Sequence, residues 1–493
     1  MFRRTFPILA CLAATLVSTS GCGRRSSAGP VVVSAIGARP AFVNPGVVPL
    51  DTASSLLMAA TAQGLVRLDA AGQVEPGLAE RWTVIDGGMT YIFRLREARW
   101  SDGKPVTATD VVTILKRQIG RLTRNPLAPF LTAIAEIKAM TPEVIEVDLA
   151  RPRPDLLRLL AQPELGVFRM SPPGGSGPMT IASWNAARSV LLQPGYDPER
   201  DIDDDDEAKP SPADNLVLIG ERAALAIVRF VEHQSDMVTG GTFSDWPLIA
   251  GSGVPPSSLH RDPAAGLFGL AVVNRTGFFA DPANRAAVSE ALDRDAALSS
   301  IAPDWPTATS ILPNQLDAAA PPASPSWAAL PIDARRADAR KRVAAWKKAG
   351  NPPVVLRIAL PGGPGATLLY GALGSDLIAI GISPQRVAPD APADLKLIDL
   401  VAPTETARWY LATACAPCGD EAAAAIEAAR TAPTPASRAQ ALTVADVALT
   451  NDAAFIPLGT PLRWSMVGPE LDLWQANARA WHPLTELRSP PTS

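Results

Sequence analysis

Hydrophobic and polar positions between residues 62 and 117 follow a pattern that predicts strands, turns and one helix. Apolar side chains at alternate positions after a Gly-Gly turn indicate a half-buried strand. These positions are Met89, Tyr91, Phe93 and Leu95. Turn residues then precede a helical pattern, for which Thr107 or Thr109 is the expected N-cap and Asp110 lies in or near the first turn.

Strand and helix patterns continue to alternate along the rest of the chain. The predicted strands include Val31–Ile36, 144–149, Leu216–Ile219, 354–361 and 396–400, with a hairpin that carries Trp184 and Tyr196. The predicted helices include 282–298, 333–350 and one whose apolar face comprises Ala224, Ile227, Val228 and Val231. This alternation predicts an α/β protein.

The first stretch, residues 62–117, also resembles the signature region of the family 5 extracellular solute-binding proteins. These are the periplasmic dipeptide, oligopeptide and nickel-type receptors of ABC importers. The matching positions are Gly64-Leu65, Asp69, Gly72, Pro76 to Glu80, Trp82, Asp86-Gly87, Thr90-Tyr91, Phe93, Leu95-Arg96, Trp100 to Gly103, Pro105, Thr107-Ala108, Asp110-Val111 and Arg117. Most of these residues set turns, cap a helix or fill a core, so they identify a fold and do not mark a binding site.

The resemblance implies a bilobal periplasmic-binding-protein fold of type II, cluster C-like, in which two crossing strands join two lobes. Its later blocks place lobe I at residues 31–268 plus 465–493, with a subdomain at 62–170. Lobe II is expected at 269–464. The ligand of such a protein lies in the cleft between the lobes, and hinge closure around it needs no covalent chemistry.

The first 21 residues are expected to be a lipoprotein signal peptide. Arg3 and Arg4 precede a short apolar stretch, and Thr19-Ser20-Gly21-Cys22 resembles a lipobox, which makes Cys22 the predicted lipidation site. An ordinary signal peptide or a twin-arginine signal are the alternatives. Residues 22–30 form a linker. We therefore expect a periplasm-facing protein of the cell envelope that is lipid-anchored to a membrane.

Composition limits the classes of function. The chain has 493 residues and a formal charge of −4; removal of Arg3 and Arg4 with the signal leaves 472 residues (493 − 21) and −6. A mildly acidic chain with 5% aromatic residues and no basic cluster argues against nucleic-acid binding. The acidic run at 201–207 lacks the spacing of an EF-hand and is expected to be a solvated loop. We expect a monomer.

Two cysteines remain beside Cys22 after the signal is removed. Cys415 and Cys418 form a Cys-x-x-Cys pair. For an exported protein a local disulfide is the favoured interpretation, with free thiols, a redox motif or half of a zinc site as alternatives. The three histidines show no ligand spacing, so no metal site and no cofactor are predicted.

Ligand-binding candidates come from two segments that flank the cleft in the family. In the first, Phe42 and Asn44, with Val43 between them, precede Pro45 and are otherwise ordinary turn residues. In the second, 400–421, this chain lacks the Asp-Pro-rich pattern with which peptide-binding relatives hold a peptide's amino group. The candidates around it are Asp399, Arg408, Trp409 and Tyr410. Core packing is the alternative for Trp409 and Tyr410.

Three functions are weighed on these grounds. The first is a lipid-anchored receptor that delivers a small solute, such as a peptide, to the permease of an ABC importer. The second is a degenerate relative that acts as an envelope scaffold or interaction protein without transport. An enzyme is the third, and it is not expected, because the chain has no Gly-x-Ser-x-Gly elbow, HExxH motif or P-loop.

Overall fold

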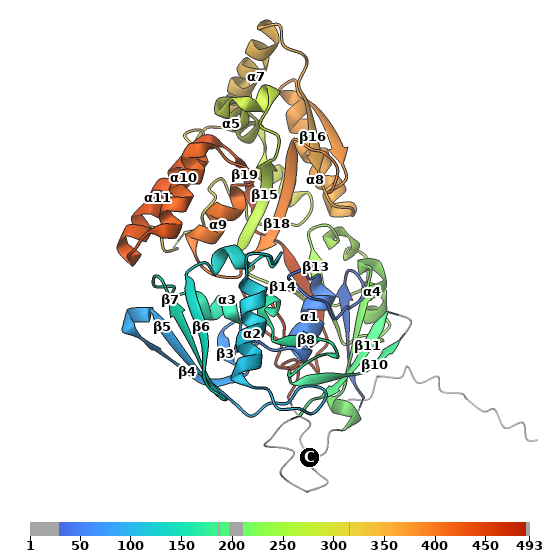
Figure 1. Ribbon diagram of the computed structural model, residues 1–493. Helices are drawn as coiled ribbons and strands as arrows, with labels where there is room; N and C mark the ends of the chain where they lie inside the picture. The colour runs from blue at the N-terminus through green and yellow to red at the C-terminus, as the bar shows by residue number, and fades with distance from the viewer. Residues whose placement is uncertain (1–28, 186–187, 197–210, 315, 490–493) are drawn as a thin grey trace, which may run out of the picture.

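The computed structural model shows two stacked lobes (Figure 1). It describes residues 29–185, 188–196, 211–314 and 316–489. The predicted signal peptide, Cys22 and the acidic run at 201–207 lie outside the described residues. Within those ranges, no helix is both long and apolar enough to cross a membrane.

A seven-stranded mixed sheet forms the base of lobe I. Its order is β10 (Met179–Asn185), β11 (Ser189–Pro194), β12 (Leu216–Glu221), β1 (Val31–Ile36), β13 (Met237–Thr242), β20 (Arg463–Val467) and β14 (Leu259–Arg261). The apolar run of β1 does not alternate, because the strand pairs in parallel with β12 and β13 in the middle of the sheet. Helix α1 (Thr52–Thr61) and helix α4 (Ala223–Val231) contact it.

Lobe I also carries a four-stranded antiparallel sheet. Its order is β4 (Ala79–Ile85), β5 (Thr90–Leu95), β7 (Val144–Leu149) and β6 (Ile134–Thr141). The predicted alternation on β5 is confirmed for Tyr91, Phe93 and Leu95, which are buried. Helix α2 (Ala108–Ile119) packs against this sheet, and Thr107 caps it in a capping box with Asp110.

Shorter elements complete lobe I. Strands β2 (Val66–Leu68) and β3 (Val74–Pro76) pair with each other, as do β8 (Phe168–Met170) and β9 (Pro173–Gly175), and α3 (Leu156–Leu160) follows β7. The chain returns to this lobe with β20, and after it Leu471, Leu484 and Leu487 are buried in the same cluster as β1.

Lobe II is built on a five-stranded sheet. Its order is β17 (Ser383–Val387), β16 (Val355–Ala359), β18 (Leu395–Val401), β15 (Gly266–Val272) and β19 (Phe455–Gly459). Its helices are α5 (Pro282–Ala291), α6 (Arg294–Ser299), α7 (Ile332–Lys348), α8 (Pro364–Ala379), α9 (Ala407–Ala414), α10 (Asp420–Thr431) and α11 (Pro435–Asp452).

Strand β15 shows how both faces of this sheet are covered. Leu270 and Val272 pack in the cluster that contains α5 and α8, whereas Leu267 and Ala271 pack in the cluster of α9, α10 and α11. Successive strand residues point to opposite faces, so an uninterrupted apolar strand is buried on both sides. This double cover is the α/β arrangement that the sequence predicts.

Two predicted helices differ from those observed. The helix expected at 282–298 is broken into α5 and α6, because Asp293 accepts a hydrogen bond from the backbone N–H of Ala296 (3.0 Å) and so starts a new helix. The apolar face predicted for α4 is wrong at Ala224, which is exposed, and at Val228, which is 57% exposed, whereas Phe230 is buried. The larger aromatic side chain faces the core, which rotates the buried stripe away from Val228.

Candidate functional site

The two large sheets are linked by an ion pair between Asp399 at the end of β18 and Arg463 at the start of β20. Arg463 Nη1 donates to Asp399 Oδ1 over 2.8 Å, and Arg463 Nη2 donates to the main-chain oxygen of Asp399 over 3.1 Å. Burial raises the pKa of Asp399, and the neighbouring guanidinium opposes this shift. The carboxylate that the sequence analysis named for a ligand's amino group is thus bound to an arginine of this chain.

Arg408 lies where α9 contacts lobe I. Its Nη2 donates to the carbonyl oxygen of Pro129 (3.1 Å), and its guanidinium lies over the Phe130 ring at 5.2 Å. The residue is only 4% exposed, yet its Nε and Nη1 have no hydrogen-bond partner. Burial, reinforced by neighbouring arginines, lowers the pKa of Arg408 to about 9, so it remains protonated at neutral pH.

Trp409 and Tyr410 pack inside lobe II. Their rings meet edge to face at 5.1 Å, and they are 6% and 2% exposed. They share a cluster with Leu267 of β15 and Leu442 of α11. Burial raises the pKa of Tyr410 to about 12. Both side chains hold α9 against the sheet and thereby fix the position of Arg408 between them and lobe I.

Phe42 and Asn44 belong to the loop that follows β1 in lobe I. The Phe42 ring packs edge to face on Phe168 at 6.0 Å. Asn44 Oδ1 accepts a hydrogen bond from the backbone N–H of Gly46 (2.9 Å), and its carbonyl oxygen accepts from Val47. These contacts are those of a turn, and they place Phe42 and Asn44 on the opposite lobe from Arg408.

Glu405 connects the lobes through two arginines, and sequence reasoning missed it. It forms ion pairs with Arg158 of α3 and, over 2.7 Å, with Arg479 of the C-terminal segment. Burial acts to raise the pKa of Glu405, but hydrogen bonds and charges from the two arginines outweigh it, so the pKa is lowered. An exposed glutamate between two apolar elements gives no signal in sequence, because its partners lie more than 70 positions away.

A cavity of about 90 Å³ lies near Arg408, and we call it the arginine cavity. It is lined by Arg151 and Arg153 of lobe I and by Asp317, Arg430 and Arg438 of lobe II, among others. The cavity leaves no signal in the sequence, since its four arginines come from two separate segments, each interrupted by prolines.

A larger cavity, of about 450 Å³, lies within lobe I alone. Trp100, stacked under Arg169 at 4.0 Å, and Tyr196, whose hydroxyl donates to Glu97 (2.9 Å), line or support it. Its lining comes from residues 63–103 and 175–196, so it has no wall from lobe II. Closure of the two lobes does not enclose it.

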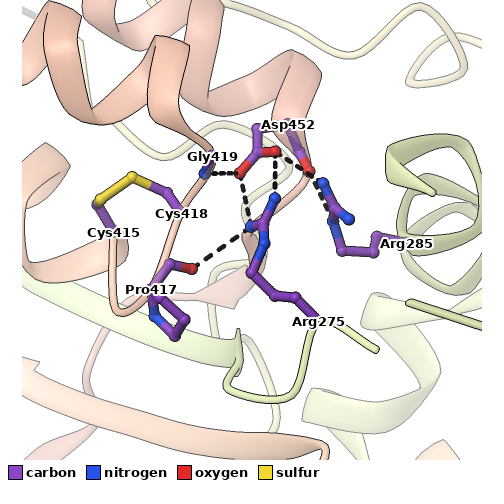
Figure 2. Close-up of a disulfide and its surroundings, with 7 residues drawn as sticks. All are labelled: Arg275, Arg285, Cys415, Pro417, Cys418, Gly419 and Asp452. Atoms are coloured by element: carbon purple, nitrogen blue, oxygen red, sulfur yellow. Dashed lines mark hydrogen bonds and ion pairs between the residues drawn. A yellow bond between two sulfur atoms is a disulfide. The ribbon is translucent and has the colours of Figure 1, made fainter. Parts of the chain in front are cut away.

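Cys415 and Cys418 are joined in a disulfide, with 4.7 Å between their Cα atoms (Figure 2). Asp452 ties down the residues that follow: it accepts from the backbone N–H of Gly419 (2.9 Å) and pairs with Arg275 and Arg285 at 2.6 and 2.7 Å. Over the described ranges, no group of three or more His, Cys, Asp or Glu side chains has the arrangement of a metal site.

Comparison with known proteins finds a matching family profile and several relatives. The family profile described as bacterial extracellular solute-binding proteins, family 5 Middle, matches residues 73–391. A probable deoxycholate-binding periplasmic protein of Escherichia coli, YgiS, is 36% identical over 144 residues. The periplasmic oligopeptide-binding protein OppA of Salmonella typhimurium is 27% identical over 267 residues. These alignments cover 26% and 47% of this chain and only 27% and 47% of the relatives.

The likeness in structure extends over nearly the whole chain. The crystal structure of Haemophilus influenzae OppA in complex with the peptide RPPGFSPFR superposes with a TM-score of 0.79 at 16% identity. The match covers 93% of this chain and 99% of that one. The predicted bilobal fold is therefore confirmed, and the relatives and structural neighbours are binding proteins rather than enzymes.

Proposed function

Because this chain belongs to the bacterial extracellular solute-binding proteins of family 5, we propose that it captures a small solute between its two lobes and delivers it to an ABC importer. A peptide or a related compound is the proposed solute class. The observation that supports this proposal most is the two-lobed fold, which superposes over 93% of the chain on an oligopeptide-binding protein.

Capture would proceed by hinge closure. The contacts of Glu405 with Arg158 and of Arg408 with the Pro129 carbonyl form only when the lobes meet. A solute that touches both lobes adds further contacts to the closed arrangement alone, and this difference in contacts shifts the population toward closure. The ion pair between Asp399 and Arg463 is proposed to persist during this movement, since it lies where the two sheets meet.

The residues named from the sequence enter this proposal in different roles. Arg408 has two unpartnered nitrogen atoms and is proposed to meet a polar group of the solute. Phe42 and Asn44 are proposed to line the lobe I side of the cleft. Trp409 and Tyr410 support α9 from inside, and Asp399 acts through Arg463 rather than on the solute.

The anchor and location are part of the proposal. Lipidation of Cys22 would tether a monomeric receptor to a membrane, facing the periplasm, where the importer's permease can collect the solute. Mass spectrometry of the mature N-terminus tests this directly. Diacylglyceryl modification of Cys22 supports the anchor, whereas an N-terminus elsewhere, with Cys22 removed or unmodified, contradicts it.

An envelope scaffold without transport is the second candidate. The observation that favours it is the tight contact between the lobes near Gly365, where an added Cβ would lie 1.9 Å from the carbonyl oxygen of Phe243. Lobes that are packed against each other this closely at one edge would serve as a rigid surface. Such a protein would not change shape on exposure to any solute.

Thermal shift with solute libraries separates the two candidates. A ligand present at a hundredfold excess over its dissociation constant stabilises a folded protein by about 2.7 kcal/mol. The receptor requires at least one peptide or related solute that raises the melting temperature. Failure of peptide, sugar and metal-complex libraries on well-folded protein would remove the basis of the receptor proposal and leave the scaffold.

A further inference from the structure

The arginine cavity is built from both lobes. Arg151 and Arg153 follow β7 in lobe I, whereas Arg430 ends α10 and Arg438 lies in the first turn of α11 in lobe II. Arg151 and Arg430 both donate to the hydroxyl oxygen of Thr132, each over 3.4 Å. Guanidinium groups of opposite lobes thus approach one atom.

Positive charge exceeds negative charge around this cavity. The guanidinium groups are those of Arg151, Arg153, Arg408, Arg430 and Arg438, and the carboxylates are those of Asp155, Asp317 and Glu427. Five against three leaves an excess of two. The guanidinium groups repel one another, and their partial burial strengthens this repulsion because water screens it less.

Several buried arginine donors here make no hydrogen bond within the described residues. Arg153 is 5% exposed and lines the cavity; its Nε forms an ion pair with Asp155 at 3.2 Å but no hydrogen bond, and neither Asp155 oxygen has a hydrogen-bond partner. The Nε of Arg438, whose Nη2 is 3.2 Å from Asp317, has no hydrogen-bond partner either. Buried polar groups in folded proteins almost always find partners, so unpaired arginine donors around a cavity indicate a missing acceptor.

The dimensions of the cavity restrict what that acceptor is. Its volume of about 90 Å³ is several times the ~10–15 Å³ that one water molecule needs on this measure. It accommodates a carboxylate or a tetrahedral oxyanion but not a whole peptide. Planar arginine forks bind such oxygens in pairs, which makes this composition suited to carboxylate or phosphate.

We propose that the arginine cavity is an oxyanion site, and that a bound phosphate or carboxylate group bridges lobe I and lobe II and holds them together. The site goes beyond the proposed function, since it acts on closure whichever solute is carried. The anion comes either free from solution or as an acidic group of a solute, and both present the same oxygens to the same guanidinium groups.

Thermal shift at constant ionic strength tests the site. Inorganic phosphate and succinate are titrated separately into the mature protein, with chloride replaced to keep the ionic strength fixed. The proposal predicts a saturable rise in melting temperature with at least one of them. A stronger response to phosphate identifies a free anion, and a stronger response to succinate identifies a carboxylate group of a solute.

Matched variants assign the response to the cavity. The double variant Arg151→Gln/Arg430→Gln removes one half-buried cation from each lobe and is expected to raise the dissociation constant at least tenfold. Arg342→Gln, on the exposed face of α7, is the control and should match the unmodified protein. If the double variant folds poorly, Arg430→Lys, which keeps the charge but loses the fork, should weaken binding severalfold.

Small-angle scattering supplies the second readout. Phosphate or succinate should lower the radius of gyration of the unmodified protein and of Arg342→Gln, and leave that of the double variant unchanged. The proposal is overturned if neither anion raises the melting temperature, or if the double variant responds as the unmodified protein does. Peptide binding that survives in the double variant would leave the receptor proposal standing on its own.

Discussion

Arg463 at the start of β20 donates to the Asp399 carboxylate at the end of β18 over 2.8 Å, and this ion pair joins the sheet of lobe I to the sheet of lobe II. Both side chains are mostly buried, with 16% and 15% of their surfaces exposed. The pair lies where the sheet of lobe I meets the sheet of lobe II.

Replacing either Asp399 or Arg463 should leave the other side chain charged and without its full set of partners. Asp399→Asn and Arg463→Gln are each expected to lower the free energy of unfolding by about 1–3 kcal/mol. The double variant should lose less than the sum of the two, because the second change removes a charge that is already unpaired. Urea denaturation of all four proteins measures this coupling, and strictly additive losses would show that the two side chains act independently.

Glu405 does not belong to the core, and we propose that its ion pairs favour closed lobes. Its side chain is 52% exposed, so each ion pair is worth little, roughly 0.2–1 kcal/mol. Glu405→Gln should shift the balance toward open lobes about twofold to fivefold and increase the radius of gyration without lowering the melting temperature much. Glu421→Gln, at the exposed start of α10, is the matched control. An unchanged scattering profile would mean that Glu405 has no part in closure.

Asp446 of α11 is expected to make the free energy of unfolding depend on pH. Burial raises its pKa to about 6, although the backbone N–H of Ala323 donates to it (2.7 Å) and opposes the shift. The folded state therefore holds this proton more tightly than the unfolded state, where the pKa is about 3.9. The contribution of protonated Asp446 to the free energy of unfolding is complete below about pH 4 and is lost as the pH rises through 6.

The corresponding substitution is Asp446→Asn. It should raise the free energy of unfolding at pH 7.5 by up to about 3 kcal/mol, which is the two-unit shift expressed as energy, and have little effect at pH 4. Urea denaturation at the two pH values measures the difference, with the exposed Asp390→Asn as control. A gain that is equal at both pH values would contradict the assignment.

The Thr107 hydroxyl oxygen accepts a hydrogen bond from the backbone N–H of Asp110 (3.3 Å), and the Asp110 carboxylate accepts one from the backbone N–H of Thr107 (3.3 Å). Thr107→Ala removes this cap of α2 and is expected to lower the free energy of unfolding by about 1 kcal/mol. Thr109→Ala, two residues on and exposed, should change it by only a few tenths of that. Equal losses would mean that the cap does not stabilise the helix.

The Cys415–Cys418 disulfide closes a very short loop. Loop-closure entropy then gives a stabilisation of only about 2 kcal/mol, so the Cys415→Ser/Cys418→Ser variant should still fold. Asp452 continues to hold Gly419 in that variant through its hydrogen bond and the two arginines. Loss of folding after reduction, or turnover of a dithiol substrate by the unmodified protein, would contradict this structural role.

Sequence patterning was sufficient for elements whose signals are local. Strand β1 begins and ends where its apolar run predicts, and the Thr107 cap follows from residues three positions apart. The break at Asp293 comes from a local cap, which the apolar pattern of residues 282–298 does not reveal. The buried face of α4 depends on tertiary packing, which selects Phe230 over Val228. The apolar pattern within the helix does not show which of these two side chains is buried.

The candidate site was harder to predict for the same reason. Asp399 is a candidate in the sequence because it lies near the end of a predicted strand, but its partner Arg463 is 64 positions away. The arginine cavity joins residues 151–154 to 430–438, and neither segment is distinctive alone. Charged residues that only the fold brings together have no characteristic spacing along the sequence.

Native mass spectrometry of the purified mature chain tests most directly whether a solute is captured between the lobes. Our account predicts a one-to-one complex with a small molecule, either carried through purification or formed with a member of a peptide library, that dissociates when the protein is unfolded. A folded protein that retains no small molecule and forms no complex with any library member would contradict it.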